Sequence, residues 1–108
     1  MTANPLGRVN VATPGTLVPL STNTSLRASK IYFQVIPGLT GKGYIGKSGL
    51  VRATLVNVIR VLWPNSAGGF SDSFFLESAA DSDVLNLSEY YVDMDVAGEG
   101  LLVTYWSE

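Results

Sequence analysis

The segment SKIYFQVI, residues 29–36, decides the fold class because its side chains alternate in character. Ile31, Phe33 and Val35 share one face, while Lys30 and the polar or aromatic residues between them share the other. Successive side chains of a β-strand point to opposite faces of a sheet, so this period of two predicts a half-buried strand. The Pro-Gly pair that follows is expected to end it.

Similar short segments lie on both sides of this strand, separated by residues that favour turns. Further strands are predicted at residues 7–12, 17–20, 73–77, 90–97 and 101–106. Turns that contain Gly are predicted at residues 13–16, 40–43 and 98–100. The last of these turns should close a hairpin between the two final strands.

Residues 50–62 allow two interpretations. Leu50, Leu55, Ile59 and Leu62 are spaced as on one side of a helix, whereas many residues among them are β-branched and favour a strand. The strand is the preferred interpretation, and the helix stays as the alternative.

Length and composition agree with one β domain. The chain has 108 residues, of which 46% are hydrophobic and 15% are charged, enough to form a single core. We predict an all-β fold, either an antiparallel β-sandwich or a small barrel, with about seven to eight short strands in a jelly-roll or Ig-like topology. The domain spans residues 1–108, and residues 1–8 could form an extended N-terminal arm.

The chain contains no Cys and no His. This composition excludes disulfides, thiolate nucleophiles and catalytic triads that contain His, and it disfavours most transition-metal sites. We therefore predict no catalytic, cofactor-binding or metal-binding residues, no cofactor and no enzyme activity.

Charge is divided along the chain. All seven basic residues precede all nine acidic residues, which begin at Asp72 and end at Glu108. The preferred interpretation is that strands from the two halves pair, so that opposite charges meet across the sheets. The alternative is a head-to-tail ring in which a basic surface of one copy meets an acidic surface of the next. A net charge of −2, without any run of adjacent basic residues, argues against nucleic acid as a partner.

We also expect no membrane partner. The most apolar stretch, residues 50–63, is interrupted by Arg52, Asn57 and Arg60, whereas a spanning helix needs about 20 mostly apolar residues. The first ten residues lack the apolar centre of a signal peptide, so synthesis and retention in a cytoplasm are expected.

Residues 41–48, GKGYIGKS, fit the phosphate-loop pattern Gly-x-x-x-x-Gly-Lys-Ser/Thr. Such a loop needs a helix directly after it, with the helix N-terminus facing the phosphate. Gly49 and the β-branched residues beyond it disfavour that helix. The preferred interpretation is a Gly-rich turn followed by a strand, and nucleotide binding is the less favoured one.

The predicted strand at residues 90–97 has two different faces. Tyr90, Val92 and Met94 should be buried, whereas Asp93 and Asp95 should lie on a wet face. The spacing of the two acids could suit paired carboxylates or calcium ligands. Alternating acids are commoner on a solvated strand face, so that interpretation is preferred.

The last predicted strand, residues 101–106, is apolar on both faces apart from one Thr. Such a strand should be covered on two sides, by a sheet and by something else, which could be a partner chain. Tyr90, Tyr91, Tyr105 and Trp106 could stack on sugars or bases. Because two of the four alternate inward, contact with the core or with a subunit is preferred.

A series of turn and strand positions runs from residue 9 to residue 106. It comprises Val9-x-Val11-x-Thr13-Pro14-Gly15-Thr16-x-Val18-x-Leu20-Ser21, Ile31-x-Phe33-Gln34, Pro37-Gly38-x-Thr40-Gly41-x-x-Tyr44-Ile45-Gly46, Leu62-x-Pro64, Tyr91-Val92-Asp93 and Gly98-x-Gly100-x-x-Val103-x-Tyr105. This series resembles small β-rich virion proteins of tailed bacteriophages, in particular the capsid decoration, or cement, proteins. In such a family, residues 40–46 would be a hairpin element.

The resemblance implies a structural role in the virion. Decoration proteins typically sit as trimers on the outside of the expanded capsid, where each bridges neighbouring major capsid subunits. We therefore expect a homotrimer that is made in the host cytoplasm, lies on the capsid exterior and has the phage major capsid protein as its partner. The alternatives are another phage structural component (head fibre, tail or baseplate) and a carbohydrate- or ligand-binding β-module. In such a module, Tyr91 or Trp106 would carry glycan binding.

Overall fold

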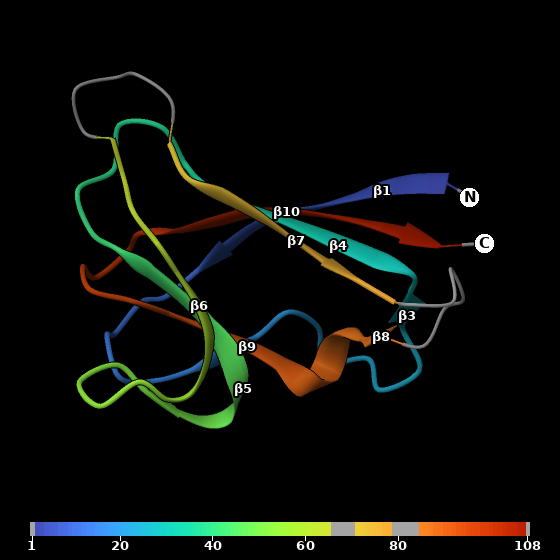
Figure 1. The fold of residues 1–108 in the computed structure, drawn as a ribbon, viewed down its shortest axis with the longest axis horizontal. Helices are drawn as coiled ribbons and strands as arrows, with labels where there is room; N and C mark the ends of the chain where they lie inside the picture. Colours follow the sequence, from blue (N-terminus) through green and yellow to red (C-terminus); the bar gives the residue numbers. More distant parts are fainter. Residues whose placement is uncertain (1, 66–70, 79–84, 108) are drawn as a thin grey trace.

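The computed structural model describes residues 2–65, 71–78 and 85–107, and these residues form ten β-strands and one turn of 3-10 helix (Figure 1). In chain order the elements are β1 (Thr2–Asn10), β2 (Val18–Pro19), β3 (Arg27–Ala28), β4 (Lys30–Val35), β5 (Gly43–Val51), β6 (Val56–Leu62), β7 (Ser73–Glu77), β8 (Leu85–Asn86), η1 (Leu87–Glu89), β9 (Tyr90–Met94) and β10 (Gly100–Ser107). Every strand pairing is antiparallel, which confirms the all-β prediction. The described strands exceed the predicted seven to eight because β3 and β8 form a separate short pair.

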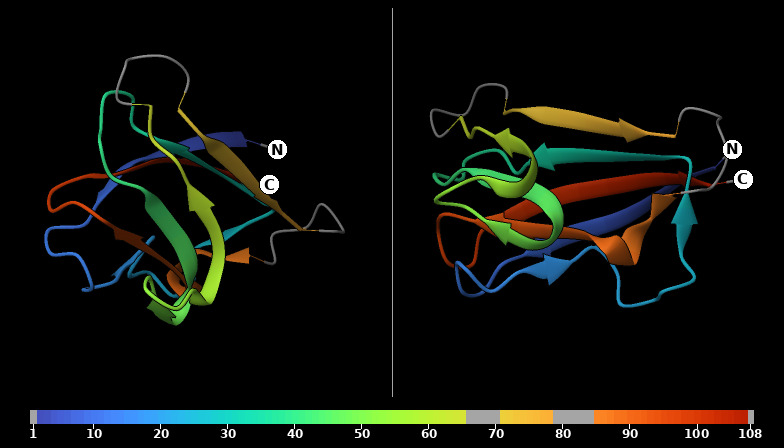
Figure 2. Two further views of the ribbon diagram at one scale, coloured as in Figure 1. Left: turned by 60° about the vertical axis from the view of Figure 1, so that its left-hand side comes forward. Right: turned by 60° about the horizontal axis from the view of Figure 1, so that its bottom comes forward.

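The other eight strands form two sheets of four, with the orders β1-β10-β4-β7 and β2-β9-β5-β6. The sheets lie against each other as two layers (Figure 2). Their inner faces share one core, in which Ile31, Phe33 and Val103 of the first sheet and Ile45 and Val92 of the second are fully buried. Within the described residues, the end strands of each order pair on one side only, so these strands form an open sandwich rather than a closed barrel.

The order of pairing identifies the topology. Among the eight main strands, the first pairs with the last (β1 with β10), the second with the seventh (β2 with β9), the third with the sixth (β4 with β7) and the fourth with the fifth (β5 with β6). This nested order is that of one long hairpin rolled into two sheets, which is the jelly roll. The structure therefore distinguishes between the two topologies that the sequence left open.

Local sequence explains several elements. The strand expected at residues 29–36 is β4, and its inward side chains Ile31, Phe33 and Val35 are all fully buried. The turn expected at residues 13–16 is present, with the Thr16 N–H donating to the Thr13 carbonyl at 3.0 Å and Gly15 at a φ of +93°. Pro and Gly at the two central positions suit this turn because Pro presets φ and Gly accepts a positive φ.

The hairpin predicted at residues 98–100 is wrong. Strand β9 pairs with β2 and β5, whereas β10 lies between β1 and β4 in the other sheet. The link between them crosses from one layer to the other, and its backbone is held by the N-terminal part of the chain: the Gly98 N–H donates to the Val11 carbonyl, and the Val11 N–H donates to the Glu99 carbonyl. A Gly-rich turn reverses the chain direction but does not determine which strand becomes the neighbour.

Residues 50–62 are extended, as preferred, but the chain reverses within them. Strand β5 ends at Val51, residues 52–55 form the turn, and β6 begins at Val56. The turn contains no Gly, Pro or Asn, and Leu55 takes a φ of +61°, so the usual signals of a reversal are absent.

Residues 2–8 do not form a separate arm. They belong to β1, which pairs with β10 from Thr2 to Asn10 and contains a bulge between Pro5 and Gly7. Strand β10 lies between β1 and β4 inside the first sheet, and it supplies the partner for β1.

Candidate functional site

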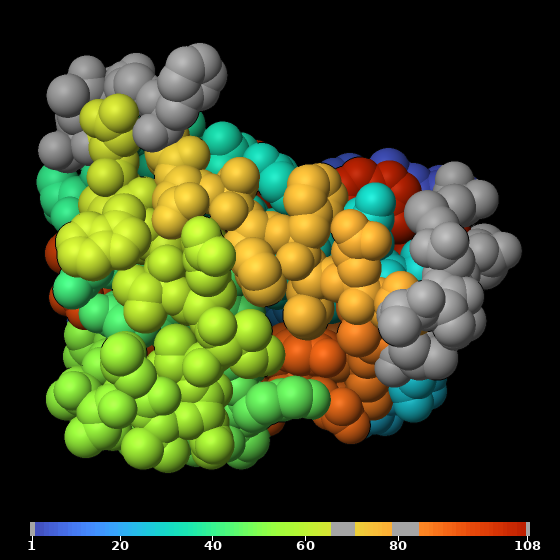
Figure 3. All heavy atoms as spheres, viewed as in Figure 1, coloured from blue at the N-terminus to red at the C-terminus, as the bar shows by residue number. Residues whose placement is uncertain are grey.

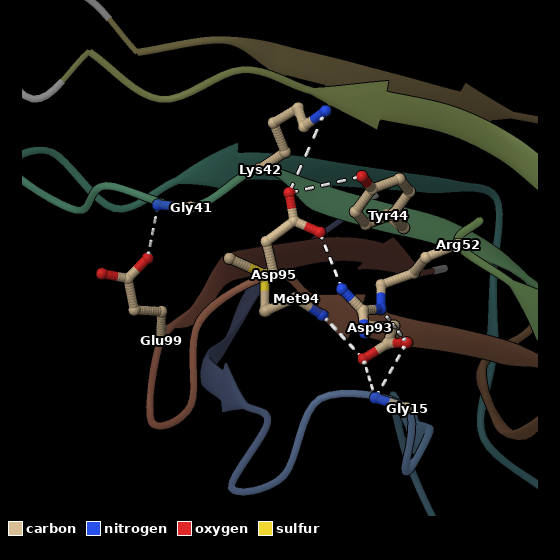
Figure 4. Close-up of polar contacts among 9 residues, drawn as sticks. All are labelled: Gly15, Gly41, Lys42, Tyr44, Arg52, Asp93, Met94, Asp95 and Glu99. Atoms are coloured by element: carbon tan, nitrogen blue, oxygen red, sulfur yellow. Dashed lines mark hydrogen bonds and ion pairs between the residues drawn. The ribbon is translucent and has the colours of Figure 1, made fainter.

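Asp93 of β9 and Asp95, which follows the end of that strand, lie in a polar cluster with side chains of β5 and of the β5–β6 turn (Figure 4). Asp93 and Asp95 share the outer face of the second sheet, as the alternation predicts, but Asp93 is only 1% exposed. The Arg52 side chain, from the hairpin turn, reaches both acids: Nε lies 2.9 Å from Asp93 Oδ2, and Nη1 lies 2.8 Å from Asp95 Oδ1. The prediction of a wet face is therefore wrong at Asp93, because the hairpin covers it.

Backbone groups complete the hydrogen bonding of Asp93. The Gly15 N–H donates to both carboxylate oxygens, at 3.0 and 3.2 Å, and the Met94 N–H donates to Oδ1 at 2.9 Å. A buried charge needs a partner and hydrogen bonds to be tolerated, and Asp93 has both. The carboxylate thus joins the turn at residues 13–16 and the turn at residues 52–55 to β9.

Tyr44 and Lys42 extend the cluster around Asp95. Tyr44 Oη lies 3.4 Å and Lys42 Nζ 4.0 Å from Asp95 Oδ2. Burial raises the pKa of Tyr44, and the negative charge of Asp95 raises it further. Burial alone would lower the pKa of Arg52, but its bonds to Asp95 and the charge of Asp93 outweigh that effect and raise it. Tyr44 therefore stays neutral and Arg52 stays charged at ordinary pH.

These features favour a structural ion-pair cluster over a catalytic or metal site. Among the described residues, no group of three or more acidic side chains could hold a metal ion. The cations that face the two acids are side chains of the protein itself: Arg52 contacts both Asp93 and Asp95, and Lys42 lies near Asp95.

The segment that fits the phosphate-loop pattern does not form such a loop. Gly43 to Val51 is strand β5, so no helix follows Lys47 and Ser48. The amides of Gly41, the first residue of the pattern, and of Thr40 just before it already bind an anionic group: they donate to the Glu99 carboxylate at 2.8 and 3.1 Å. This agrees with the preferred interpretation of a turn and a strand.

Basic residues of the first half of the chain form ion pairs with acidic residues of the second half. All five ion pairs among the described residues join a base from the first half to an acid from the second. Lys30 and Glu77, for example, face each other across β4 and β7, and Lys47 Nζ lies 3.6 Å from Glu89 Oε2. The expectation that opposite charges meet inside one copy is confirmed.

The outer face of the first sheet carries a group of aromatic side chains, here called the aromatic face and defined as Tyr32, Phe75 and Trp106. The rings of Tyr32 and Phe75 have centroids 4.6 Å apart, and those of Phe75 and Trp106 are 6.0 Å apart. Lys30 Nζ lies 5.2 Å from the Phe75 centroid and 5.6 Å from that of Trp106. Phe75 remains 46% exposed, so much of this group faces solvent.

A second apolar surface lies on the β5–β6 hairpin. This hairpin surface, defined as Val51, Leu55, Val56 and Ile59, consists of aliphatic side chains that are 41–54% exposed. The hairpin occupies much of one side of the molecule, as the yellow-green atoms in Figure 3 show. Strand β6 pairs only with β5, so its other edge has no partner strand among the described residues.

The four aromatic residues near the C-terminus do not form one site. Tyr90 is buried and Tyr105 packs against the core, which agrees with the prediction that two of the four point inward. Tyr91 lies on the outer face of the second sheet and Trp106 on that of the first. Sequence reasoning did not bring Trp106 together with Tyr32 and Phe75. The alternation within each strand predicts that these side chains point outward. The pairing register of β10 with β4 and of β4 with β7 is what places them side by side, and the sequence does not show that register.

Comparison of the chain with protein-family models, with curated proteins and with solved structures found no match. Within the described ranges, no helix is both long and apolar enough to cross a membrane. The arguments on function therefore rest on the geometry of the surfaces described above.

Proposed function

We propose that this protein is a structural component of a virus particle, a decoration protein that binds the outside of the expanded capsid of a tailed bacteriophage and stabilises it. The observation that carries the proposal is the grouping of exposed large apolar side chains on two surfaces of a jelly roll. Grouped apolar residues mark surfaces that bind other proteins, whereas scattered ones do not. The resemblance to decoration proteins supplies the kind of partner.

The two surfaces suit different partners. The side chains that define the hairpin surface are all aliphatic and uncharged. The centre of a lasting interface between identical subunits is likewise poor in charged residues. We assign it to self-association as a homotrimer. The aromatic face combines Tyr, Phe and Trp rings with Lys30 and Glu77 at its border. Aromatic anchors with a polar rim are typical of binding hot spots, so we assign this face to the major capsid protein.

Mass action then explains the function without any reacting group. A protein that binds the expanded shell and not its precursor stabilises the expanded form by RT ln(1 + [L]/Kd) for each site. At a free concentration one hundred times Kd, this amounts to about 2.7 kcal/mol per site. Because a capsid offers many equivalent sites, the effect accumulates over the particle.

The jelly roll agrees with both leading hypotheses, since viral capsid proteins and lectins use this architecture. A fold alone does not determine function, so the surfaces and not the topology carry the argument. Head fibres, tails and baseplates also need β domains with protein-binding surfaces. The experiment below therefore also tests the location within the virion.

The experiment measures self-association and capsid binding separately. Size-exclusion chromatography with light scattering should give a trimer, and co-sedimentation with purified capsids should show binding to expanded particles and not to precursors. Ile59→Asp should yield monomers, while Phe75→Ser should leave the trimer intact and lose capsid binding. Ala12→Asp, an exposed position outside both surfaces, is the control. A monomeric wild-type protein that fails to bind expanded capsids would refute the proposal, and binding to tails instead would move it to the alternative.

A further inference from the structure

An open groove of about 380 Å³ lies where β5 meets η1 and β9, on the sheet opposite to the one that carries the aromatic face. It is lined by Lys47 and Ser48 of β5, Ser88 and Glu89 of η1, and Tyr91 of β9. In Figure 3, the green atoms of β5 border the orange atoms of η1 and β9 on this side of the molecule. The volume is near the lower end of the range for small-molecule sites, roughly 300–1,000 Å³.

The charges in the groove compensate each other. Lys47 Nζ lies 3.6 Å from Glu89 Oε2, and it also lies over the Tyr90 ring, 4.4 Å from the centroid. An anionic ligand would have to approach Glu89 and displace it from Lys47. This arrangement disfavours a phosphate group, although Lys47 and Ser48 belong to the phosphate-loop pattern in the sequence.

Several polar atoms in the groove remain available. Neither the Ser48 hydroxyl nor the Tyr91 hydroxyl makes a hydrogen bond to any residue that the structure describes, while the Ser88 hydroxyl donates to Asn86 Oδ1 at 2.8 Å and can still accept. The Glu89 carboxylate is largely exposed. The groove thus offers acceptors, donors and hydroxyl groups that serve as both.

We propose that this groove binds a neutral saccharide of one or two rings. The half-buried Tyr91 side chain supplies an aromatic surface for the C–H groups of a sugar ring, and it is held in place between β2 and β5 opposite Pro19 and Gly46. Glu89 and Lys47 are spaced to accept from and donate to neighbouring sugar hydroxyls, and Ser48 adds a third contact. A polyol satisfies these groups without adding charge.

This inference does not depend on the assembly proposed above, because none of the five residues that line the groove belongs to the aromatic face or to the hairpin surface, although the groove and the hairpin surface share β5. Since the groove is shallow and open, a single site should bind weakly, with a Kd of about 1 mM. In a trimer, three such sites would bind a surface polysaccharide more tightly through avidity.

The test is a titration of ¹⁵N-labelled protein, followed by NMR, with a panel of neutral mono- and disaccharides and with inorganic phosphate as a separate arm. At least one saccharide should give saturable shifts at the amides of residues 47–48 and 88–91, and phosphate should not. Tyr91→Ala should weaken binding at least tenfold, and Ser48→Ala several-fold. Tyr91→Phe retains the ring, so it should retain most of the binding. The dispersion of amide signals in the spectrum of each variant shows whether that variant is folded.

Trp106→Ala, on the opposite sheet, is the matched control and should bind sugar as the wild type does. The proposal is overturned if no saccharide gives saturable shifts up to about 100 mM, if phosphate alone binds, or if Tyr91→Ala binds as well as Tyr91→Phe. Loss of binding in Trp106→Ala with retention in Tyr91→Ala would also overturn it, because it would place the site on the aromatic face. Capsid binding by Phe75→Ser is scored separately, so the two proposals fail independently.

Discussion

Replacing Arg52 with Met tests whether the buried acid on β9 holds the sandwich and its hairpin together. The substitution keeps most of the apolar stem of Arg52 and removes the cation that lies 2.9 Å from Asp93 and 2.8 Å from Asp95. Asp93, only 1% exposed, would keep its bonds from Gly15 and Met94 but would lose its counter-charge.

The expected loss follows from the burial of the partners. Removing one partner of a fully buried ion pair costs about 3–5 kcal/mol. The side chains of Arg52 and Asp95 are 28% and 29% exposed, so water replaces part of the lost interaction. We therefore expect the free energy of unfolding to fall by about 2–3 kcal/mol. The control, Glu89→Gln, removes an ion pair whose side chains are 47% and 60% exposed, and it should cost about 0.5 kcal/mol or less.

Urea denaturation followed by Trp fluorescence measures both variants. With a slope of about 1–3 kcal/mol per molar urea, Arg52→Met should lower the midpoint by about 0.7–3 M, and Glu89→Gln should change it far less. The double variant with Asp93→Asn should lose less than the sum of the single losses, because the two residues interact directly. If Arg52→Met and Glu89→Gln lose the same small amount, the cluster is not a structural lock and the reasoning fails.

Two further changes test other parts of the structure. Gly46→Ala should lower the free energy of unfolding by about 2 kcal/mol or more, because a Cβ at this position would collide with the Asn57 carbonyl oxygen and lie 2.8 Å from Leu50 Cδ1; the neighbouring Ser48→Ala, at an exposed position, should have little effect in the same urea titration. The raised pKa of Tyr44 means that the folded state keeps its proton above pH 10, where the unfolded chain loses it. Stability should therefore be unaffected below about pH 10 and fall as pH rises from there through the folded-state pKa. Unfolding curves of Tyr44→Phe should show a smaller fall over this range, and an identical fall would contradict the assignment.

Much of the local structure could be read from residue patterns. The alternation in residues 29–36 predicted the buried face of β4, and the strand predicted at residues 73–77 is β7 with the same bounds. The turn at residues 13–16 was predicted because Pro and Gly restrict φ within the turn itself. These predictions succeeded because each depends on neighbours in the sequence.

The failures involve contacts between distant segments. Asp93 occupies a position with the correct periodicity for a wet face, yet the β5–β6 hairpin covers it, and nothing near Asp93 in the sequence signals that cover. The predicted hairpin after β9 failed for a related reason, since β10 gains two neighbours, β1 and β4, from the other sheet. Both outcomes depend on how the two layers pack.

The sequence by itself determined the class of this protein. Alternating apolar side chains and frequent turn residues require β-strands, and the lack of Cys and His excludes thiol and imidazole chemistry, because both follow from the chemical nature of each residue. Only the tertiary structure decided the jelly-roll pairing, the burial of Asp93, the aromatic face and the groove beside Tyr91. Strand order and register are set by the packing of both sheets on one core, which brings together residues that no local pattern connects.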